Sequence, residues 1–411
     1  MYDLAIIGAG AAGIACAKDA LAAKFRVILI EREEKYFGGT CLNTGCIPTK
    51  FFLNSSKLGK SWEESFSRVK EIVAKIKQPL LFYLEKQGLD IVWGQASFID
   101  KNTLDVSGRK INAENIVIAT GSSPKSILND KRIIPAEELF NKDTLGDKVL
   151  IIGAGYIGME FASLLHNLGK TVCVAEKEDR ILPGFDKQLA NRLASILSKK
   201  GIDIRTSSDV TEFDRDDYDF ILSAVGRKPN IAGLKTENVG LSLQNYGWIN
   251  TDSFMRTNIE NIYACGDVTG KMLLAYVAEY QARICVNNIR GTSTQENYKD
   301  IAECVFSLPQ IAKVGVLDEE VRKENIRYKV LKSNFLRYSS AYVYDDMDGF
   351  IKVVVDEKNK IIGAGIISHS AAELINIFSL CIKNGLGLEE LRRCLFIHPT
   401  ISEIIPSLFL D

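Results

Sequence analysis

The hydrophobic pattern at the start of the chain predicts a strand, a helix and a second strand. Asp3–Ile7 is a short apolar run, a glycine-rich turn and a helical pattern follow it through Ala23, and Phe25–Ile30 is a second apolar run that ends at Glu31. Uninterrupted apolar runs of this length are typical of strands buried on both faces of a parallel sheet. We therefore expect a β-α-β unit here.

The same pattern occurs again in the middle of the chain. Lys148–Ile152 and Thr171–Ala175 are predicted strands, Met159–Leu168 is a predicted helix between them, and the second strand ends at Glu176. In both copies the closing acid lies 23 positions after the first glycine of the turn. One copy alone is a weak indication, but two copies with matched spacing predict a repeated structural unit.

Each turn has the spacing of a dinucleotide-binding fingerprint. Gly8 permits the tight turn, Gly10 lets the backbone approach a pyrophosphate, and Gly13 allows close packing of helix on strand. The helix N-terminus offers free N–H groups to the phosphates, and we expect Glu31 to accept hydrogen bonds from a ribose. The corresponding residues of the second copy are Gly153, Gly155, Gly158 and Glu176.

Two dinucleotide sites in one chain suggest a flavin and a nicotinamide that exchange electrons, so we predict FAD at the first site and NAD at the second. Glu176 would repel a ribose 2′-phosphate, which favours NAD over NADP. Lys177 and Arg180 lie close by in sequence. We interpret them as solvated charges that follow a strand.

Length and charge exclude several classes of protein. The 411 residues are enough for two or three domains, and 51 basic against 52 acidic residues leave no basic excess for nucleic-acid binding. The uncharged apolar stretch Leu4–Ala17 has 14 residues, fewer than the ~18 of a membrane span. Nine scattered cysteines argue against a secreted disulfide framework. We expect a cytoplasmic protein with no nucleic-acid or membrane partner.

Two cysteines form a candidate redox pair. Four residues separate Cys41 from Cys46, which is too many for a thioredoxin-type pair, and no second pair follows to complete a zinc site. Pro48 suits the first turn of a helix, so Cys46 lies near a helix N-terminus, where the dipole favours a reactive thiolate. The surrounding glycines allow a small disulfide ring to close. The alternative is two buried structural thiols.

This segment, Gly-Gly-Thr-Cys-Leu-Asn-x-Gly-Cys-Ile-Pro-x-Lys, resembles the signature of the class I pyridine nucleotide–disulfide oxidoreductases. Leu42 and Ile47 in this segment are more typical of dihydrolipoyl dehydrogenases than of other members of the family. The resemblance runs from about residue 2 to residue 405. It implies that Cys46 lies against the flavin as the charge-transfer thiolate and that Cys41 exchanges with a dithiol substrate.

The resemblance also implies roles for residues around this pair. Lys50 matches the lysine near the flavin, Glu160 matches its ion-pair partner, and Tyr156 falls where the family has a residue that covers the flavin until nicotinamide arrives. From its residue type alone, a helical lysine such as Lys50 would be solvent-exposed.

Further segments resemble the cofactor domains of the family. Thr120 and Gly121 follow an apolar strand similar to the one that leads out of the FAD domain, and Gly226 has the same place at the end of the NAD domain. Asp267 matches the aspartate that binds the ribityl chain of FAD. A helical pattern from about Leu273 to Ile289 follows, and its N-terminus could stabilise negative charge on the flavin.

A histidine near the C-terminus is the candidate base. A histidine before a proline, as at His398, is on its own more typical of a turn, but a dithiol needs a base near neutral pH, and a carboxylate such as Glu403 can orient it. The resemblance implies that His398 is this base, that Glu403 orients it, and that the pair serves the disulfide of a partner subunit in a homodimer. His166 and His369 match no catalytic position.

The chain departs from the family at several positions. Phe396 and Tyr276 replace histidines that dihydrolipoyl dehydrogenases usually carry, and Tyr338–Asp348 is aromatic and acidic where small and basic residues are usual. The 209–220 region is shortened. These departures do not affect the proposed redox residues, and they leave the identity of the substrate open. The proposed redox residues are Cys41, Cys46, Lys50, Glu160, His398 and Glu403.

The predicted fold is α/β, with two Rossmann-like dinucleotide-binding domains and a C-terminal α+β dimerisation domain. The predicted boundaries are 1–126 with 228–296 for the FAD domain, 127–227 for the NAD domain and 297–411 for the interface domain.

The predicted reaction oxidises dihydrolipoamide to lipoamide with NAD⁺ through a Cys41–Cys46 disulfide. The substrate would be either a small dithiol or disulfide, or the lipoyl group of a lipoyl domain. One alternative is an NAD(P)H-dependent reductase of another small disulfide, similar to glutathione reductase. Another is a non-catalytic flavoprotein scaffold or NADH sensor.

Overall fold

The structure is a computed structural model that describes residues 1–126, 130–323 and 327–408. The described chain forms two compact units, an N-terminal unit of Met1–Ile127, Glu137–Thr144 and Val225–Glu296, and a second unit of Leu128–Ala136, Leu145–Ala224 and Asn297–Asp411. The predicted start of the NAD domain at residue 127 lies outside the described residues.

The N-terminal unit is built on a parallel sheet in the order β3-β2-β1-β6, with β14 beside β6. The predicted β-α-β unit forms β1, α1 and β2. An antiparallel extension, β4-β5, pairs with the first residues of β6. The elements are β1 (Tyr2–Ile7), α1 (Ala11–Ala22), β2 (Val27–Glu31), β3 (Asp90–Trp93), β4 (Ala96–Asp100), β5 (Thr103–Val106), β6 (Arg109–Ile118) and β14 (Ile262–Ala264).

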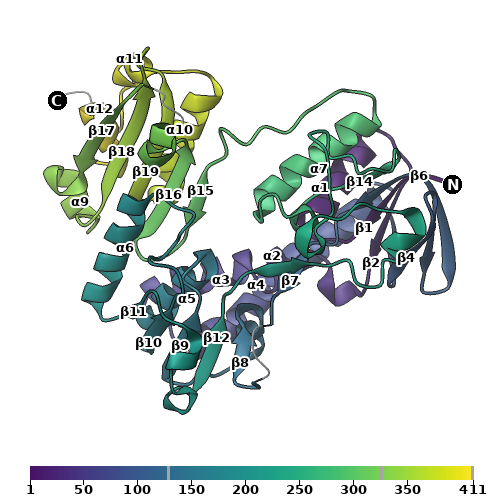
Figure 1. Ribbon diagram of the computed structural model, residues 1–411, viewed down its shortest axis with the longest axis horizontal. Helices are drawn as coiled ribbons and strands as arrows, with labels where there is room; N and C mark the ends of the chain where they lie inside the picture. Colours follow the sequence, from purple (N-terminus) through teal and green to yellow (C-terminus); the bar gives the residue numbers. More distant parts are fainter. Residues whose placement is uncertain (127–129, 324–326, 409–411) are drawn as a thin grey trace. The chain divides into compact units, whose positions relative to one another are not determined.

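Both faces of this sheet are buried, which explains the uninterrupted apolar runs. Leu4 and Ile6 of β1 pack on one face with α1 and α7 (Ala275–Ile289), and Figure 1 shows these two helices side by side. Ala5 and Ile7 point to the opposite face, where they join the core beneath β4 and β5. Successive residues of a strand alternate between faces, so each residue of the strand must be apolar.

Three helices follow the first β-α-β unit, namely α2 (Gly39–Asn43), α3 (Cys46–Lys57) and α4 (Trp62–Lys86). The Phe52 ring of α3 stacks on Trp62 of α4 with 4.0 Å between centroids, and Phe140 packs against both rings. The Trp62 indole N–H donates to the carbonyl oxygen of Lys142. These contacts hold Glu137–Thr144 in the N-terminal unit.

The second unit begins with a parallel sheet in the order β11-β10-β9-β12-β8. The strands are β8 (Ile133–Pro135), β9 (Lys148–Ile152), β10 (Thr171–Ala175), β11 (Asp203–Arg205) and β12 (Phe220–Ser223), with helices α5 (Tyr156–Asn167) and α6 (Lys187–Lys200). In each sheet the first strand of the repeated unit, β1 or β9, lies between the second strand of that unit, β2 or β10, and a later strand, β6 or β12. The repeat in sequence is therefore also a repeat in topology.

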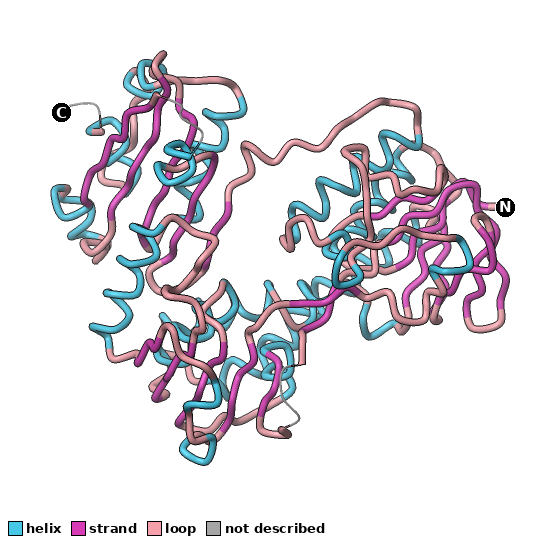
Figure 2. Tube along the Cα trace, viewed as in Figure 1, coloured by secondary structure: helices cyan, strands magenta, loops and turns pink. Residues whose placement is uncertain are grey.

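The C-terminal part of the same unit is an antiparallel sheet in the order β15-β16-β19-β18-β17, visible as magenta strands in Figure 2. The strands are β15 (Glu303–Val305), β16 (Gln310–Gly315), β17 (Tyr328–Asn334), β18 (Phe350–Asp356) and β19 (Ile361–Ser368). The helices are α8 (Asp318–Lys323), α9 (Ser339–Val343), α10 (Ala371–Lys383), α11 (Leu388–Arg392) and α12 (Ile404–Ser407). The predicted fold class is confirmed.

A buried charge cluster joins α6 to the C-terminal sheet. The fully buried ammonium of Lys352 on β18 lies 2.5 Å from carboxylate oxygens of both Asp186 and Asp318. Asp186 also caps α6 by accepting the N–H groups of Gln188 and Leu189. Removing one partner of such a cluster would leave a buried charge uncompensated, so it fixes the helix on the sheet.

Two short strands connect segments of the N-terminal unit that are distant in sequence. β7 (Ser122–Pro124) pairs antiparallel with β13 (Arg227–Pro229). This pairing brings the segment after β6 next to the segment after β12. Among the described residues, no helix combines the length and apolar character needed to cross a membrane.

Candidate active site

The turn between β1 and α1 is shaped by backbone contacts that only glycine permits. A Cβ at Gly8, whose φ is +106°, would lie 2.4 Å from the carbonyl oxygen of Ala119, and a Cβ at Gly13 would lie 1.8 Å from that of Gly8. Gly10 caps α1 without a side-chain hydrogen bond. The first N–H groups of the helix therefore stay available for phosphate oxygens.

The acid at the end of β2 is tied to this turn. One carboxylate oxygen of Glu31 accepts the N–H of Ala9 at 2.8 Å, and the other accepts that of Arg32 at 2.7 Å. Each oxygen has a second lone pair, so Glu31 can also accept hydrogen bonds from a ribose at the helix N-terminus.

One buried oxygen near the same turn has no hydrogen-bond partner among the described residues. It is the Oγ1 of Thr120, whose Cα lies 3.1 Å from where a Cβ of Gly8 would be. The Asp267 side chain is 26% exposed, and its Oδ2 accepts a hydrogen bond from Ser122 at 2.6 Å. A buried hydroxyl without a partner and a partly exposed carboxylate fit a hydroxyl-rich ligand such as the sugar chain of FAD.

The second predicted FAD segment packs directly on the first. A Cβ at Gly266 would lie 3.0 Å from the Cβ of Ala12 on α1, so the loop that carries Asp267 contacts the fingerprint helix. Gly121 has a φ of +69° and joins Thr120 to β7. The structure thus brings together Gly8, Gly10, Gly13, Glu31, Thr120, Gly121 and Asp267 in one cradle.

The two candidate redox cysteines lie on successive short helices. Cys41 is half-buried on α2, and exposed Cys46 is the first residue of α3, whose N-cap is Gly45. Both are free thiols. A hydrogen bond with Cys46, together with burial, raises the pKa of the Cys41 thiol well above its usual range, whereas the nearby Lys50 charge acts in the opposite direction. Cys41 is therefore the sulfur that keeps its proton.

Backbone contacts hold the cysteine helices against the first cradle. A Cβ at Gly39 would lie 2.7 Å from the Cα of Gly10. The Asn43 amide donates to the carbonyl oxygens of Phe37 and Gly39, at 3.0 and 2.8 Å. The pair is thus adjacent to the proposed pyrophosphate site.

Glu279 is a neighbour of the pair that the sequence did not indicate. It lies on α7, and its negative charge adds to the rise in the pKa of Cys41. In sequence it is one polar position of an amphipathic helix. Only the packing of α7 on α1 places it near the cysteines.

The second unit repeats the cradle between β9 and α5. A Cβ at Gly158 would lie 1.9 Å from the carbonyl oxygen of Gly153, whereas a Cβ at Gly155 would meet nothing within 4 Å. The buried Glu176 carboxylate accepts the N–H of Ala154 at 2.6 Å, as Glu31 does with Ala9. This repetition fits a second dinucleotide, NAD. Gly226 belongs to the N-terminal unit, and its contribution to NAD binding stays a prediction.

The first turns of α5 are attached to the C-terminal sheet. The Tyr156 hydroxyl donates to the carboxylate of Glu303 on β15, and the Tyr156 ring packs edge-on against Phe185 with 5.4 Å between centroids. Buried Glu160 accepts the N–H of Phe306 at 3.0 Å. Glu160 lies in the second unit and Lys50 in the N-terminal unit, so their pairing stays a prediction.

His398 and Glu403 lie together as expected. The Nδ1 of His398 is 2.6 Å from a carboxylate oxygen of Glu403, whose other oxygen accepts the N–H of Thr400. That N–H, followed by the His398 hydrogen bond, lowers the pKa of Glu403. An ionised carboxylate only accepts hydrogen bonds, so Nδ1 carries the ring proton and Nε2 keeps its lone pair. The His398 side chain is 72% exposed.

Two replaced histidine positions, Phe396 and Tyr276, and the two histidines without a predicted catalytic role, His166 and His369, lie in the following surroundings. Phe396 packs on the apolar core of the C-terminal sheet, and Tyr276 is exposed in the first turn of α7. The N–H of His369 donates to the buried carboxylate of Asp346, and His166 is near the end of α5.

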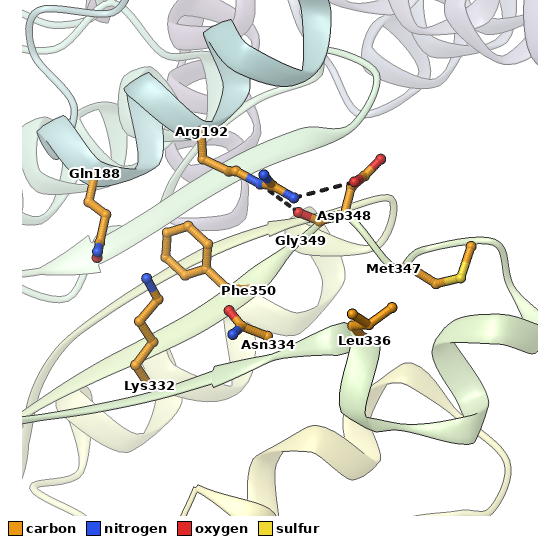
Figure 3. A pocket seen from close by; sticks show the side chains of 9 residues that line it. All are labelled: Gln188, Arg192, Lys332, Asn334, Leu336, Met347, Asp348, Gly349 and Phe350. Atoms are coloured by element: carbon orange, nitrogen blue, oxygen red, sulfur yellow. Dashed lines mark hydrogen bonds and ion pairs between the residues drawn. The ribbon is translucent and has the colours of Figure 1, made fainter. Parts of the chain in front are cut away.

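A cavity of about 370 Å³ lies elsewhere, between α6 and the strands β17 and β18 (Figure 3). In this cavity Arg192 donates to the carbonyl and the carboxylate of Asp348, and the Lys332 ammonium lies 4.0 Å from the centre of the Phe350 ring. No predicted site residue lines it.

Comparisons with known proteins match nearly the whole chain. Residues 2–282 match the family model described as pyridine nucleotide-disulphide oxidoreductase, and residues 301–408 match the dimerisation domain of that family. Dihydrolipoyl dehydrogenases of Chlamydia pneumoniae and Bacillus subtilis are each 32% identical to this chain. The two matches span 98% of this chain and, respectively, 95% and 94% of the relatives.

Among solved structures, the HOCl-induced flavoprotein disulfide reductase RclA from Escherichia coli, in its Cu(II) complex, has a TM-score of 0.94 at 30% identity. The match covers 100% of this chain and 99% of that one.

Proposed function

Because the chain belongs to the pyridine nucleotide-disulphide oxidoreductase family, we propose that it oxidises dihydrolipoamide to lipoamide with NAD⁺ through a Cys41–Cys46 disulfide. The hydrogen-bonded pair of thiols on α2 and α3, held against the first cradle, carries this proposal. The identity to dihydrolipoyl dehydrogenases over 98% of the chain supports the choice of substrate.

FAD and NAD are the cofactors, as the sequence predicted, and the protein is an oxidoreductase. We assign FAD to the cradle of the N-terminal unit, where Glu31, Thr120 and Asp267 offer polar atoms to its sugars. We assign NAD to the cradle of α5, with Glu176 at the ribose. When bound, FAD and NAD⁺ would together accept the two electrons that the dithiol substrate gives up.

The protein's own chemistry is thiol–disulfide exchange. A substrate thiolate attacks the Cys41 sulfur of the oxidised pair, which breaks the Cys41–Cys46 bond and releases Cys46 as a thiolate. The second substrate thiolate then attacks the mixed disulfide, closes the substrate disulfide and releases Cys41. Two electrons thereby pass from the dithiol to the pair. Cys41 keeps its proton because it donates a hydrogen bond to Cys46, so Cys46 holds the thiolate of the reduced pair.

His398 supplies the base for these steps. Its Nε2 lone pair takes a proton from a substrate thiol, and the Glu403 carboxylate fixes the tautomer and stabilises the imidazolium that forms. We propose that this pair serves Cys41 of a second copy in a homodimer, which agrees with the match of residues 301–408 to a dimerisation domain.

A disulfide reductase that acts in the opposite direction on another small disulfide is a second candidate. The resemblance to RclA, described as a flavoprotein disulfide reductase, favours it. The same thiol pair serves both directions, so the choice depends on the substrate.

A substrate panel distinguishes the candidates. Purified holoenzyme is assayed with dihydrolipoamide and NAD⁺, and with NADH or NADPH against lipoamide, glutathione disulfide and cystine. We expect the highest kcat/KM with dihydrolipoamide. Higher activity on another disulfide would favour the second candidate, and no turnover with any of them would contradict both.

The role of Cys46 has its own spectroscopic test. Anaerobic NADH should give a long-wavelength absorbance band from the Cys46 thiolate beside the flavin. The band should be absent in Cys46→Ser. Cys41→Ser has no disulfide to reduce, so its Cys46 thiolate should give the band before NADH is added, and NADH should remove the band because its electrons then stay on the flavin. Absence of the band from the wild-type protein would contradict the assignment of Cys46.

A further inference from the structure

A polar network inside the N-terminal unit ends at the carboxylate of Asp267. The guanidinium of Arg227, whose side chain is 12% exposed, donates from Nε to the Ser122 hydroxyl at 2.6 Å and from Nη2 to the Ser122 carbonyl oxygen at 2.7 Å. The same hydroxyl lies 2.6 Å from Oδ2 of Asp267. Three residues from three separate segments thus form one chain of hydrogen bonds.

The chemistry of the groups fixes the direction of these bonds. Arginine has only donors, so the Ser122 oxygen must accept from Arg227, and its single proton is then directed to Asp267. Bonds between a donor and an ionised carboxylate are the stronger ones. Oδ2 of Asp267 is therefore fixed, and Oδ1 is left for a ligand.

Arg227 is itself anchored. Its Nη1 donates to the Glu137 carboxylate, and its strand β13 pairs with the β7 residues that carry Ser122. The Nε atom also lies 3.8 Å from Oδ2 of Asp267. One cation thus lies between two partly buried carboxylates, and removing it would take a neighbouring positive charge from both.

We propose that Arg227 is a positioning residue for FAD, which acts through Ser122 to hold Asp267 in the orientation that accepts a hydrogen bond from a hydroxyl of the FAD sugar chain. This inference rests on the proposed role of Asp267. It changes the interpretation of the Gly226-Arg227 segment, which the sequence assigned to the end of the NAD domain. In the structure this segment belongs to the N-terminal unit, and the Nε atom of Arg227 lies 3.8 Å from the carboxylate of Asp267.

The experiment measures FAD binding directly. The flavin is removed, and the FAD dissociation constant is determined by fluorescence for the wild type, Ser122→Ala, Arg227→Met and Arg227→Lys. Loss of one bond to a charged group predicts about tenfold weaker binding for Ser122→Ala and at least that for Arg227→Met. Lys228→Met, an exposed neighbour on β13, is the matched control and should bind FAD as the wild type does.

The pathway through Asp267 is tested by a double-mutant cycle. Asp267→Asn is combined with Ser122→Ala, and the double variant should bind FAD no more weakly than Asp267→Asn alone, because Ser122 acts only through that carboxylate. Additive losses would overturn the proposal, and so would wild-type affinity in Ser122→Ala. Ser122→Ala leaves the Arg227–Glu137 ion pair in place, so the test remains if Arg227→Met fails to fold.

These results are independent of the substrate. If the substrate panel fails while the FAD constants change as stated, the proposed activity is wrong and the role of Arg227 stands. If Asp267→Asn binds FAD with wild-type affinity, the ribityl assignment and this inference both fail.

Discussion

At the scale of single residues, the hydrogen bond with Glu403 determines which nitrogen of His398 is basic. Glu403 directs the proton of His398 to Nδ1, so that Nε2 is the basic atom. We expect His398→Ala to lower kcat by about a hundredfold or more and Glu403→Gln to lower it less, because glutamine orients the ring without its charge. Steady-state kinetics with dihydrolipoamide measure both, and equal losses would contradict the smaller effect expected for Glu403→Gln. Cys394→Ser, an exposed residue nearby in sequence, is the control.

The same pair predicts a dependence of stability on pH. The pKa of Glu403 is lowered, first by the Thr400 N–H and then by His398, so its ionised form is stabilised by folding. A lowered carboxyl pKa contributes stability above the usual range of a glutamate, and this contribution is lost as pH falls through the lowered value. The difference in thermal midpoint between wild type and Glu403→Gln should thus be present at neutral pH and disappear in acid. A difference that grows in acid would contradict this sign.

Glu176 predicts the choice of nicotinamide cofactor. Its buried carboxylate is fixed by the N–H groups of Ala154 and Glu178 at the end of β10, where a ribose 2′-phosphate would meet a negative charge. We expect the wild type to prefer NADH over NADPH by tenfold or more in kcat/KM, about 1.4 kcal/mol, and Glu176→Ala to reduce that ratio. Glu178→Gln is the matched control. A better kcat/KM with NADPH would contradict the assignment.

At the scale of elements, much of the site could be predicted because its signals are local. The strands Lys148–Ile152 and Thr171–Ala175 have the predicted bounds. Helix α5 begins at Tyr156, three residues before the predicted Met159, because Gly158 is already helical and packs on the carbonyl of Gly153. A fingerprint glycine thus belongs to the helix that follows the turn.

The remaining features depend on contacts between distant segments. β7 and β13 are three residues each, contain proline and lack an apolar pattern, so neither could be predicted. The contact of Arg227 with Asp267 through Ser122 depends on their pairing. Glu279 likewise reaches the cysteines only through the packing of α7. Local periodicity contains no information on such contacts.

Gly158 and Gly155 of the second cradle differ in the space available for a side chain. A Cβ at Gly158 would overlap the backbone of Gly153, so Gly158→Ala should destabilise the protein by about 1–3 kcal/mol and weaken NADH binding. A Cβ at Gly155 meets open space where the pyrophosphate would lie, so Gly155→Ala should weaken NADH binding while the thermal midpoint is unchanged. Both should retain FAD. Calorimetry and NADH titration test this, and unchanged NADH affinity in Gly155→Ala would contradict the assignment.

At the scale of the whole molecule, the proposed base and the proposed disulfide belong to different compact units of the chain. The exposed ring of His398 is flanked by Leu395 and Ile397, which are 99% and 78% exposed, in a segment that matches a dimerisation domain. Apolar residues exposed to this extent are expected at a surface that another molecule covers. A second copy would cover it in a homodimer.

A mixed dimer tests whether the site is completed by that second copy. Cys41→Ser and His398→Ala chains with different affinity tags are co-expressed, and the dimer that carries both tags is isolated. If each disulfide is served by the His398 of the other copy, one of the two sites contains both intact residues, and the mixed dimer should have about half the wild-type turnover per dimer. Both parent homodimers should have about a hundredth of the wild-type turnover or less, because every site in them lacks either Cys41 or His398. A mixed dimer as inactive as its parents would mean that the base serves the disulfide of its own chain, since every chain in it then lacks one of the two residues.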